Sequence, residues 1–331
     1  MVQRDQVVGC LLGKCVADAL GVPAEGRGVA AAAQWVEHLR ASSVEEIAES
    51  FIGQYTDDSQ LARELMISCV ERGGFDPADY ARRIADLFDQ RRVYGAGAAT
   101  KRAAERLLWG VAWDQAGEPA PAAGNGTAMR AAPVGLLHAG DADAMARVAH
   151  EQGVCTHLDP RCSAGAAAIA GAVSAAARGG ALDTAAFCAE VADLAARFDE
   201  PLAADIRALP GMLDATTDEA GRQIARAGRR PEDEAAQPYH WEGISPFVVP
   251  SVLWSLYAFL REPEDYLAAV ILAIEPGGDT DTTAAMTGAI SGARLGVEAV
   301  PRELRALIND FDEWEEAELT ELAEAFWELG R

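Results

Sequence analysis

Three segments of the sequence place a small residue at every fourth position, and this spacing strongly constrains the fold. The segments are Gly9, Gly13, Ala17 and Gly21; Ala164, Ala168 and Ala172; and Ala284, Gly288, Gly292 and Gly296. Residues four apart lie on one face of a helix, so each segment predicts a smooth stripe that lets a neighbouring backbone approach closely. Each interior glycine costs a helix about 1 kcal/mol relative to alanine. We therefore interpret the stripes as surfaces for close helix packing and not as part of a functional site.

Most of the remaining sequence also follows a helical period. Leu61, Leu65 and Cys69 share one face of a helix predicted over 61–72. The same reasoning predicts helices over 79–91, 99–109, 143–152, 163–178, 183–198, 250–261, 264–274, 282–295 and 314–329. We find no strand-like segments alternating with helices, the pattern of a βαβ fold. The sequence therefore predicts an all-α fold with many helices.

We expect residues 1–331 to form a single domain. A domain of this length buries about three quarters of the surface that its unfolded chain exposes. The stretch 213–243 is polar and interrupted by Gly and Pro, so we expect a surface excursion or a partly mobile loop there. It does not divide the chain into two domains, because the candidate site residues described below fall on both sides of it.

Charge and cysteine content narrow the classes of function. The formal net charge is −24, which repels phosphate backbones, so nucleic-acid binding is not expected. We find no run of about 18 uncharged apolar residues and therefore expect no membrane-spanning helix. The first ten residues carry Asp5 and no long apolar region, so we expect no signal peptide. Six cysteines without a CxxC pair indicate reduced thiols in a cytoplasmic protein.

Two acidic clusters each precede a predicted helix. The first is YTDDSQ at 55–60, and the second is GGDTDT at 277–282. Helix capping explains one acid and one hydroxyl at each helix start, but it does not require two acids and two threonines behind a Gly-Gly turn. Four carboxylates brought together would repel each other unless a cation lay between them. Carboxylate and hydroxyl oxygens suit Mg²⁺, Mn²⁺ or Ca²⁺, so capping and a metal site both remain open.

Three further segments are candidates for a site. Gly124, Asn125 and Gly126 form a turn before a helix and could present N–H groups to a phosphate, although most turns of this kind are only turns. His157 follows Thr156, and a lone histidine most often has a structural role. Glu25 follows the first predicted helix, and composition alone makes it a solvated loop residue.

Taken together and in order, these segments resemble the ADP-ribosylglycohydrolase family of the dinitrogenase-reductase-activating glycohydrolase type. The resemblance rests on GCLLGKCVADALGVPAEG at 9–26, YTDDSQLA at 55–62, YGAG at 94–97, GNGTAMRAAPVGL at 124–136, THLDP at 156–160 and GGDTDTTAAMTGAISGARLG at 277–296. It covers almost the whole chain. Its most specific part is the pair TDD and GGDTDT in this order and separation.

The resemblance implies a domain of orthogonally packed helices that holds two divalent cations, Mg²⁺ or Mn²⁺, in a cleft. The implied metal ligands are Thr56, Asp57, Asp58, Asp279, Asp281 and Thr282. The implied substrate contacts are Gly95, Gly97, Gly124, Asn125, Gly126 and His157. The implied reaction is hydrolysis of the bond between ADP-ribose and an acceptor, most often an Arg or Ser side chain of an ADP-ribosylated protein. Hydrolysis at the ribose needs a carboxylate near the anomeric carbon, and Glu25 and Asp58 are its candidates.

Three positions depart from the family pattern. Ser59 stands where Thr is common and keeps the hydroxyl, Ala17 stands where Gly is usual, and Asp159 stands where a second His often follows the first. The last change could alter acceptor choice. Two other functions stay open. One is a hydrolase of small compounds such as O-acyl-ADP-ribose. The other is a non-catalytic protein that binds ADP-ribose or metal or has a structural role, against which the six intact ligand positions argue.

Overall fold

The computed structural model describes residues 2–230, 233 and 241–331. Within these ranges the chain forms helices and isolated β-bridges but no sheet, so the predicted all-α class is confirmed. The α-helices are α1 Arg4–Gly21, α2 Val29–Ala41, α3 Val44–Ser50, α4 Asp57–Arg72, α5 Pro77–Asp89, α6 Ala98–Leu108, α7 Ala132–Leu137, α8 Ala142–Val154, α9 Pro160–Ala176, α10 Thr184–Ala195, α11 Glu200–Ala208, α12 Thr217–Ile224, α14 Val248–Arg261, α15 Tyr266–Ile274, α16 Thr280–Leu295, α17 Arg302–Arg305 and α18 Glu316–Leu329. The 3₁₀-helices are η1 Val22–Ala24, η2 Asn125–Thr127, η3 Leu209–Met212 and η4 Val297–Ala299.

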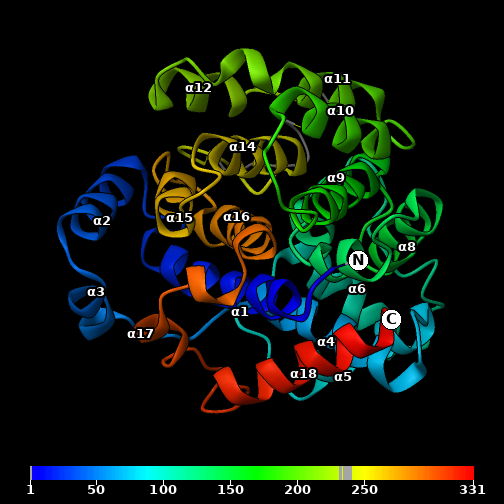
Figure 1. Cartoon of the computed structure of the whole chain (residues 1–331). Helices are drawn as coiled ribbons and strands as arrows, with labels where there is room; N and C mark the ends of the chain where they lie inside the picture. Colours follow the sequence, from blue (N-terminus) through cyan, green and yellow to red (C-terminus); the bar gives the residue numbers. More distant parts are fainter. Residues whose placement is uncertain (1, 231–232, 234–240) are drawn as a thin grey trace.

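Helices α1 and α16 lie side by side at the centre of the molecule (Figure 1) and meet along the predicted glycine stripes. A Cβ atom on Gly292 would lie 2.0 Å from the carbonyl oxygen of Gly9, and one on Gly288 would lie 2.5 Å from that of Gly13. Both contacts are closer than any carbon side chain tolerates. The stripes are therefore the surface along which these two helices approach closely.

The other helices surround this central pair. Helix α9 carries the third small-residue stripe, and all its residues from Arg161 to Ala176 are buried where α9 contacts α7, α8, α10, α14 and α16. Figure 1 shows α10, α11 and α12 along one edge and α4, α5 and α18 along the opposite one. The buried apolar residues form one continuous core from α1 to α18.

Each helix predicted from periodicity overlaps a helix of the structure. Helices α4 and α16 begin earlier than the period indicates, because their first turns are the acidic clusters. Helices α2, α3, α7, α11, α12 and α17 were not predicted. Most of them are short, and the longer α2 buries only Ala32, Val36 and Leu39, which gives a weak periodic signal.

The prediction of a loop over 213–243 is wrong in part, because α12 lies within this stretch. Thr216 and Glu219 form a reciprocal capping box at its start, and Ala220, Gly221 and Ile224 are buried. Polar residues at the other positions conceal this short amphipathic helix from the periodicity argument. Residues 231–232 and 234–240 of the same stretch lie outside the described residues.

Helix α1 also corrects the expectation that no helix has the length and composition to cross a membrane. The span 4–24 satisfies both conditions, and 89% of its apolar window is buried inside the fold. This span contains no long run of uncharged apolar residues, because Lys14 and Asp18 interrupt it, and the sequence criterion therefore excluded it. Its apolar residues are those of a core helix.

Candidate functional site

Asp18 of α1 determines where α4 begins. Its carboxylate accepts hydrogen bonds from Thr56 Oγ1 at 2.9 Å and Ser59 Oγ at 2.6 Å. It also accepts from the backbone N–H groups of Thr56 and Ser59, each at 3.1 Å. The side chain is fully buried, and burial, with the nearby charge of Asp58, raises the pKa of Asp18 to about 7. The first acidic cluster is thus attached to α1 through a residue that we did not predict as part of the site.

The Gly-Gly turn positions the second cluster. Gly277 and Gly278 have φ values of +69° and +95°, which favour glycine. Ile244 N donates to Gly277 O at 3.0 Å, and Asp279 N donates to Ile244 O at 2.8 Å. The hydroxyl of Thr280 donates to Gly21 O at the end of α1, at 2.8 Å. Helix α1 therefore contacts the starts of both α4 and α16.

The two clusters meet at Asp58. Its Oδ2 accepts hydrogen bonds from Thr56 Oγ1 at 3.3 Å and Thr282 Oγ1 at 3.2 Å. Its Oδ1 is buried and has no hydrogen-bond partner among the described residues. One oxygen from each of Glu25, Asp279 and Asp281 lies within 4.8 Å of the others. Glu25, which lies outside both acidic clusters in the sequence, joins the second one in space.

The carboxyl groups of the site hold protons more tightly than isolated ones. Burial raises the pKa of Asp279 to about 8, and the charge of Asp58 adds to the effect. Burial and neighbouring carboxylates raise the pKa values of Asp57 and Asp281 well above their usual range. Asp279 occupies the N-cap position of α16 without making a side-chain cap hydrogen bond. Capping therefore does not explain this residue, and a bound cation would relieve the burial and repulsion that raise these pKa values.

The predicted site residues line one cleft of about 610 Å³. They are Glu25, Asp57, Asp58, Asp279, Asp281, Thr282, Gly95, Gly97, Gly124, Asn125, Gly126 and His157. Thr56 is not in the cleft wall, but it contacts Asp58 and Asp18. Positions far apart in the sequence thus come together as the acidic wall and the glycine-rich wall of a single cavity.

Asn125 contacts the acidic cluster directly. Its Nδ2 donates to Asp279 Oδ2 and to Ser251 Oγ, the latter at 3.0 Å. Its backbone N–H donates to Pro246 O at 3.0 Å. This N–H is therefore not free for a phosphate, and the phosphate-binding prediction now rests on the rest of the loop. The Asn125 side chain instead orients the Asp279 carboxylate.

His157 lies against the glycine loop. A Cβ atom on Gly126 would lie 2.9 Å from His157 Cε1, and one on Gly124 would lie 3.2 Å from Nε2. Thr156 Oγ1 lies 2.9 Å from Nδ1. Burial lowers the pKa of His157 to about 3, and the charge of Arg130 lowers it further. The imidazole is therefore neutral near pH 7, and the two glycines leave space for its ring.

Two glycines border the cleft near α6. Gly95 has a φ of +92°, and a Cβ atom there would lie 3.2 Å from Asp57 Oδ1. Gly97 is the N-cap residue of α6. Gly95 therefore allows the loop to approach the first acidic cluster, while Gly97 marks where the helical wall of the cleft begins.

Several lining residues carried no recognisable sequence signal. Thr100, Arg102, Met129 and Trp241 border the cleft, and Arg102 forms an ion pair with Glu118 at 2.9 Å. Thr100 and Arg102 both lie on α6, Met129 lies within the 124–136 segment but was not singled out there, and Trp241 belongs to none of the quoted segments. Only the packing of the helices places them together.

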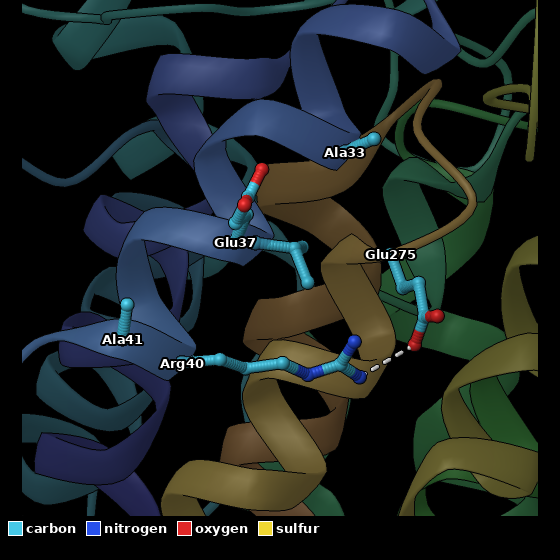
Figure 2. A pocket seen from close by; sticks show the side chains of 6 residues that line it. Ala33, Glu37, Arg40, Ala41 and Glu275 are labelled. Atoms are coloured by element: carbon cyan, nitrogen blue, oxygen red, sulfur yellow. Dashed lines mark hydrogen bonds and ion pairs between the residues drawn. The ribbon is translucent and has the colours of Figure 1, made fainter.

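A second hollow of about 370 Å³ lies between α2 and the end of α15. Figure 2 shows Arg40 extending from α2 to Glu275, with which it forms an ion pair of 2.8 Å. The other labelled side chains are Ala33, Glu37 and Ala41. No group of carboxylates or hydroxyls converges here, so we assign the candidate site to the acidic cleft.

The fold and the cleft define an all-α protein with a carboxylate-rich site suited to hard cations. The sequence profile described as ADP-ribosylglycohydrolase matches residues 1–331, and the chain belongs to this family.

The chain is also similar to individual proteins of known sequence or structure. It is 28% identical to the mouse ADP-ribosylhydrolase ARH3 over 92% of this chain and 88% of that protein. It is 24% identical to the ADP-ribosyl-dinitrogen reductase glycohydrolase of Rhodospirillum rubrum over 90% of this chain and 88% of that protein. A solved structure titled as an ADP-ribosylglycohydrolase-related protein complex superposes with a TM-score of 0.69, at 24% identity and 99% coverage of both chains. That likeness shows the shared fold.

Proposed function

We propose that this chain is a divalent-cation-dependent hydrolase that cleaves the bond between ADP-ribose and an acceptor, most directly a modified Arg or Ser side chain. The observation that carries the proposal is the contact between the two acidic clusters in the wall of a cleft. There Thr282 Oγ1 donates a hydrogen bond to Asp58 Oδ2 at 3.2 Å. Membership of the ADP-ribosylglycohydrolase family supports the reaction class. The names of the mouse and Rhodospirillum relatives support an ADP-ribosylated substrate.

The residues present fit a pair of Mg²⁺ or Mn²⁺ ions. The proposed ligands are Thr56, Asp57, Asp58, Asp279, Asp281 and Thr282, all of which offer oxygen atoms. Asp58 Oδ1, buried without a hydrogen-bond partner among the described residues, is available as a ligand. Bound cations would offset the repulsion between the carboxylates and would lower the pKa of a coordinated water.

Glu25 is our candidate for the carboxylate that acts at the ribose. It lines the cleft and is only partly buried, whereas Asp58 is buried and its Oδ2 accepts from two threonines. Burial and the charge of Asp58 raise the pKa of Glu25, which improves it as a proton acceptor near neutral pH. Cleavage at the anomeric carbon passes through a cationic, oxocarbenium-like state. A carboxylate at this position stabilises that charge and accepts the proton of the attacking water.

The six cysteines support a cytoplasmic location as part of this proposal. All six are unpaired and buried, and unpaired thiols are typical of reducing compartments.

The experiment incubates the purified protein with peptides ADP-ribosylated on Arg or Ser and with O-acyl-ADP-ribose. Each substrate is tested with Mg²⁺, with Mn²⁺ and after treatment with a chelator. Chromatography measures the ADP-ribose released. We expect release from at least one peptide only when a divalent cation is present. Full activity after rigorous removal of metal would contradict the metal site, and activity on the acyl compound alone would contradict the protein substrate.

A further inference from the structure

Lys14 is a lysine inside the protein that forms no ion pair with any acid among the described residues. The residue is 1% exposed, and its Nζ atom has no hydrogen-bond partner among the residues that the structure describes. An ammonium group away from water is costly unless opposite charge compensates it. Helix α1 nevertheless holds this group in its buried, mainly apolar middle.

The opposite charge nearest along α1 is the carboxylate of Asp18. Lys14 and Asp18 are four residues apart and lie on the same face of the helix, one turn from each other. Asp18 in turn binds the first turn of α4, which carries Asp58. The positive charge of Lys14 lowers the pKa of both Asp18 and Asp58, opposing the effect of burial on each. The ammonium group therefore influences the acidic cluster through its charge and not through a hydrogen bond.

We propose that Lys14 is a fixed counter-charge of the acidic cluster and that it controls how tightly the site binds divalent cations. This inference rests on the cation site of the proposed function. A protein that gathers these carboxylates needs positive charge to remain folded when no cation is bound, and Lys14 supplies part of it. The same charge repels an incoming cation. Lys14 should therefore stabilise the cation-free protein and weaken cation binding, two effects of opposite sign on the same site.

The substitution Lys14→Met tests both effects. Methionine is unbranched, flexible and of similar length, so it fills the space without the charge. By Coulomb's law with an effective dielectric constant of about 20, a single positive charge inside the same fold repels a divalent cation strongly enough that its removal tightens binding at least about tenfold. The matched control is Lys101→Met, which removes the other lysine of the chain from an exposed position on α6.

Two measurements at pH 7.5 and low ionic strength test whether Lys14 weakens cation binding and stabilises the cation-free protein. Calorimetric titration with Mn²⁺ gives the dissociation constant, and thermal melting in chelator gives the stability of the cation-free protein. For Lys14→Met we expect binding at least about tenfold tighter and a lower melting temperature in chelator that excess Mn²⁺ largely restores. For Lys101→Met we expect both values to stay near wild type. Lys14→Arg keeps the charge and should keep the wild-type affinity.

Several outcomes would overturn the inference. A role in packing alone predicts unchanged or weaker Mn²⁺ binding in Lys14→Met. Failure of both Lys14→Met and Lys14→Gln to fold with excess Mn²⁺ would also contradict it, because the cation should replace the lost charge. If the wild type bound no Mn²⁺ or Mg²⁺, the proposed function itself would fail. If the wild type bound Mn²⁺ and the methionine variant bound it equally, only the role of Lys14 would fail.

Discussion

Replacing Gly292 with alanine tests whether the close approach of α1 and α16 builds both the core and the site. The added Cβ would lie 2.0 Å from the oxygen and 2.6 Å from the carbonyl carbon of Gly9. Both are backbone atoms of a helix, so no side-chain rotation relieves the contact. The two helices must separate by about 1 Å before the contact becomes tolerable in a close-packed interior.

The expected loss of stability in Gly292→Ala is the difference between two opposing effects. Overpacking a core costs about 1–3 kcal/mol, and alanine returns about 1 kcal/mol through its higher helix propensity. Because the clash joins two backbones, we expect overpacking at the upper end of its range and a net loss of about 2 kcal/mol. For a chain of this length that loss lowers the melting temperature by roughly 3–4 °C.

The same separation should disturb the acidic cluster. At Gly21, the last residue of the small-residue stripe of α1, an added Cβ would lie 2.4 Å from the Cα of Asp281. Movement of α1 away from α16 therefore shifts the two clusters relative to each other. The rise in melting temperature produced by Mg²⁺ should be smaller in Gly292→Ala than in the wild type.

Differential scanning calorimetry with and without Mg²⁺ measures both effects. The control is Gly211→Ala in η3, where an added Cβ meets no atom within 4 Å and φ is not in the positive range. We expect the control to stay within about 0.5 kcal/mol of the wild type. If Gly292→Ala melted at or above the wild-type temperature, helix propensity would have outweighed the clash and the reasoning would be refuted.

Three further predictions concern the carboxylates. Asp281→Asn should sharply weaken Mn²⁺ binding in a calorimetric titration. The cation-free protein should melt at or above the wild-type temperature, because a neutral amide avoids the burial and repulsion that raise the pKa of Asp281; unchanged affinity would remove Asp281 from the ligands. Glu25→Gln should lower kcat by about 10²–10⁴-fold while calorimetry still detects ADP-ribose binding; wild-type turnover would exclude Glu25 from catalysis, and lost binding would make it a binding residue. In chelator, the free energy of unfolding should fall as the pH rises from about 4 to about 8, because the folded protein keeps protons on Asp18 and Asp279, with pKa values of about 7 and 8, that the unfolded chain releases near pH 4. The slope is about 1.4 kcal/mol per pH unit for each such proton. Excess Mg²⁺ should flatten this slope, and a melting temperature that rises over the same interval would contradict the raised pKa values.

The sequence predicted the parts of the protein whose signal is local. The glycine stripes require a close neighbour wherever they occur, and the two acid-rich helix starts carry their ligand types in adjacent positions. Helix α12 escaped prediction because only Ala220, Gly221 and Ile224 turn inward. Short helices with narrow buried faces give too few apolar positions to establish a period.

The contacts between distant segments could not be predicted from local patterns. Asp18 is an isolated acid in the apolar part of α1, and nothing in the adjacent sequence indicates that it accepts hydrogen bonds from Thr56 and Ser59. Asn125 looked like part of a phosphate-binding turn, but its side chain contacts Asp279. Glu25 looked solvated because the sequence does not show that it faces Asp279 and Asp281. Each of these properties depends on which helices pack together.

The pairing of α1 with α16 has a consequence for how the chain is made. Gly9 and Gly292 lie near opposite ends of the sequence, so a ribosome releases α1 long before it synthesises the helix that covers it. During that interval the apolar face of α1 has no permanent partner, and such surfaces are prone to aggregate or to be held by chaperones. The proposed cation site cannot form until α16 has emerged, because Asp281 and Thr282 belong to α16 and Asp279 is its N-cap residue. The contact between α1 and α16 therefore makes synthesis of α16 a condition for assembling the candidate site.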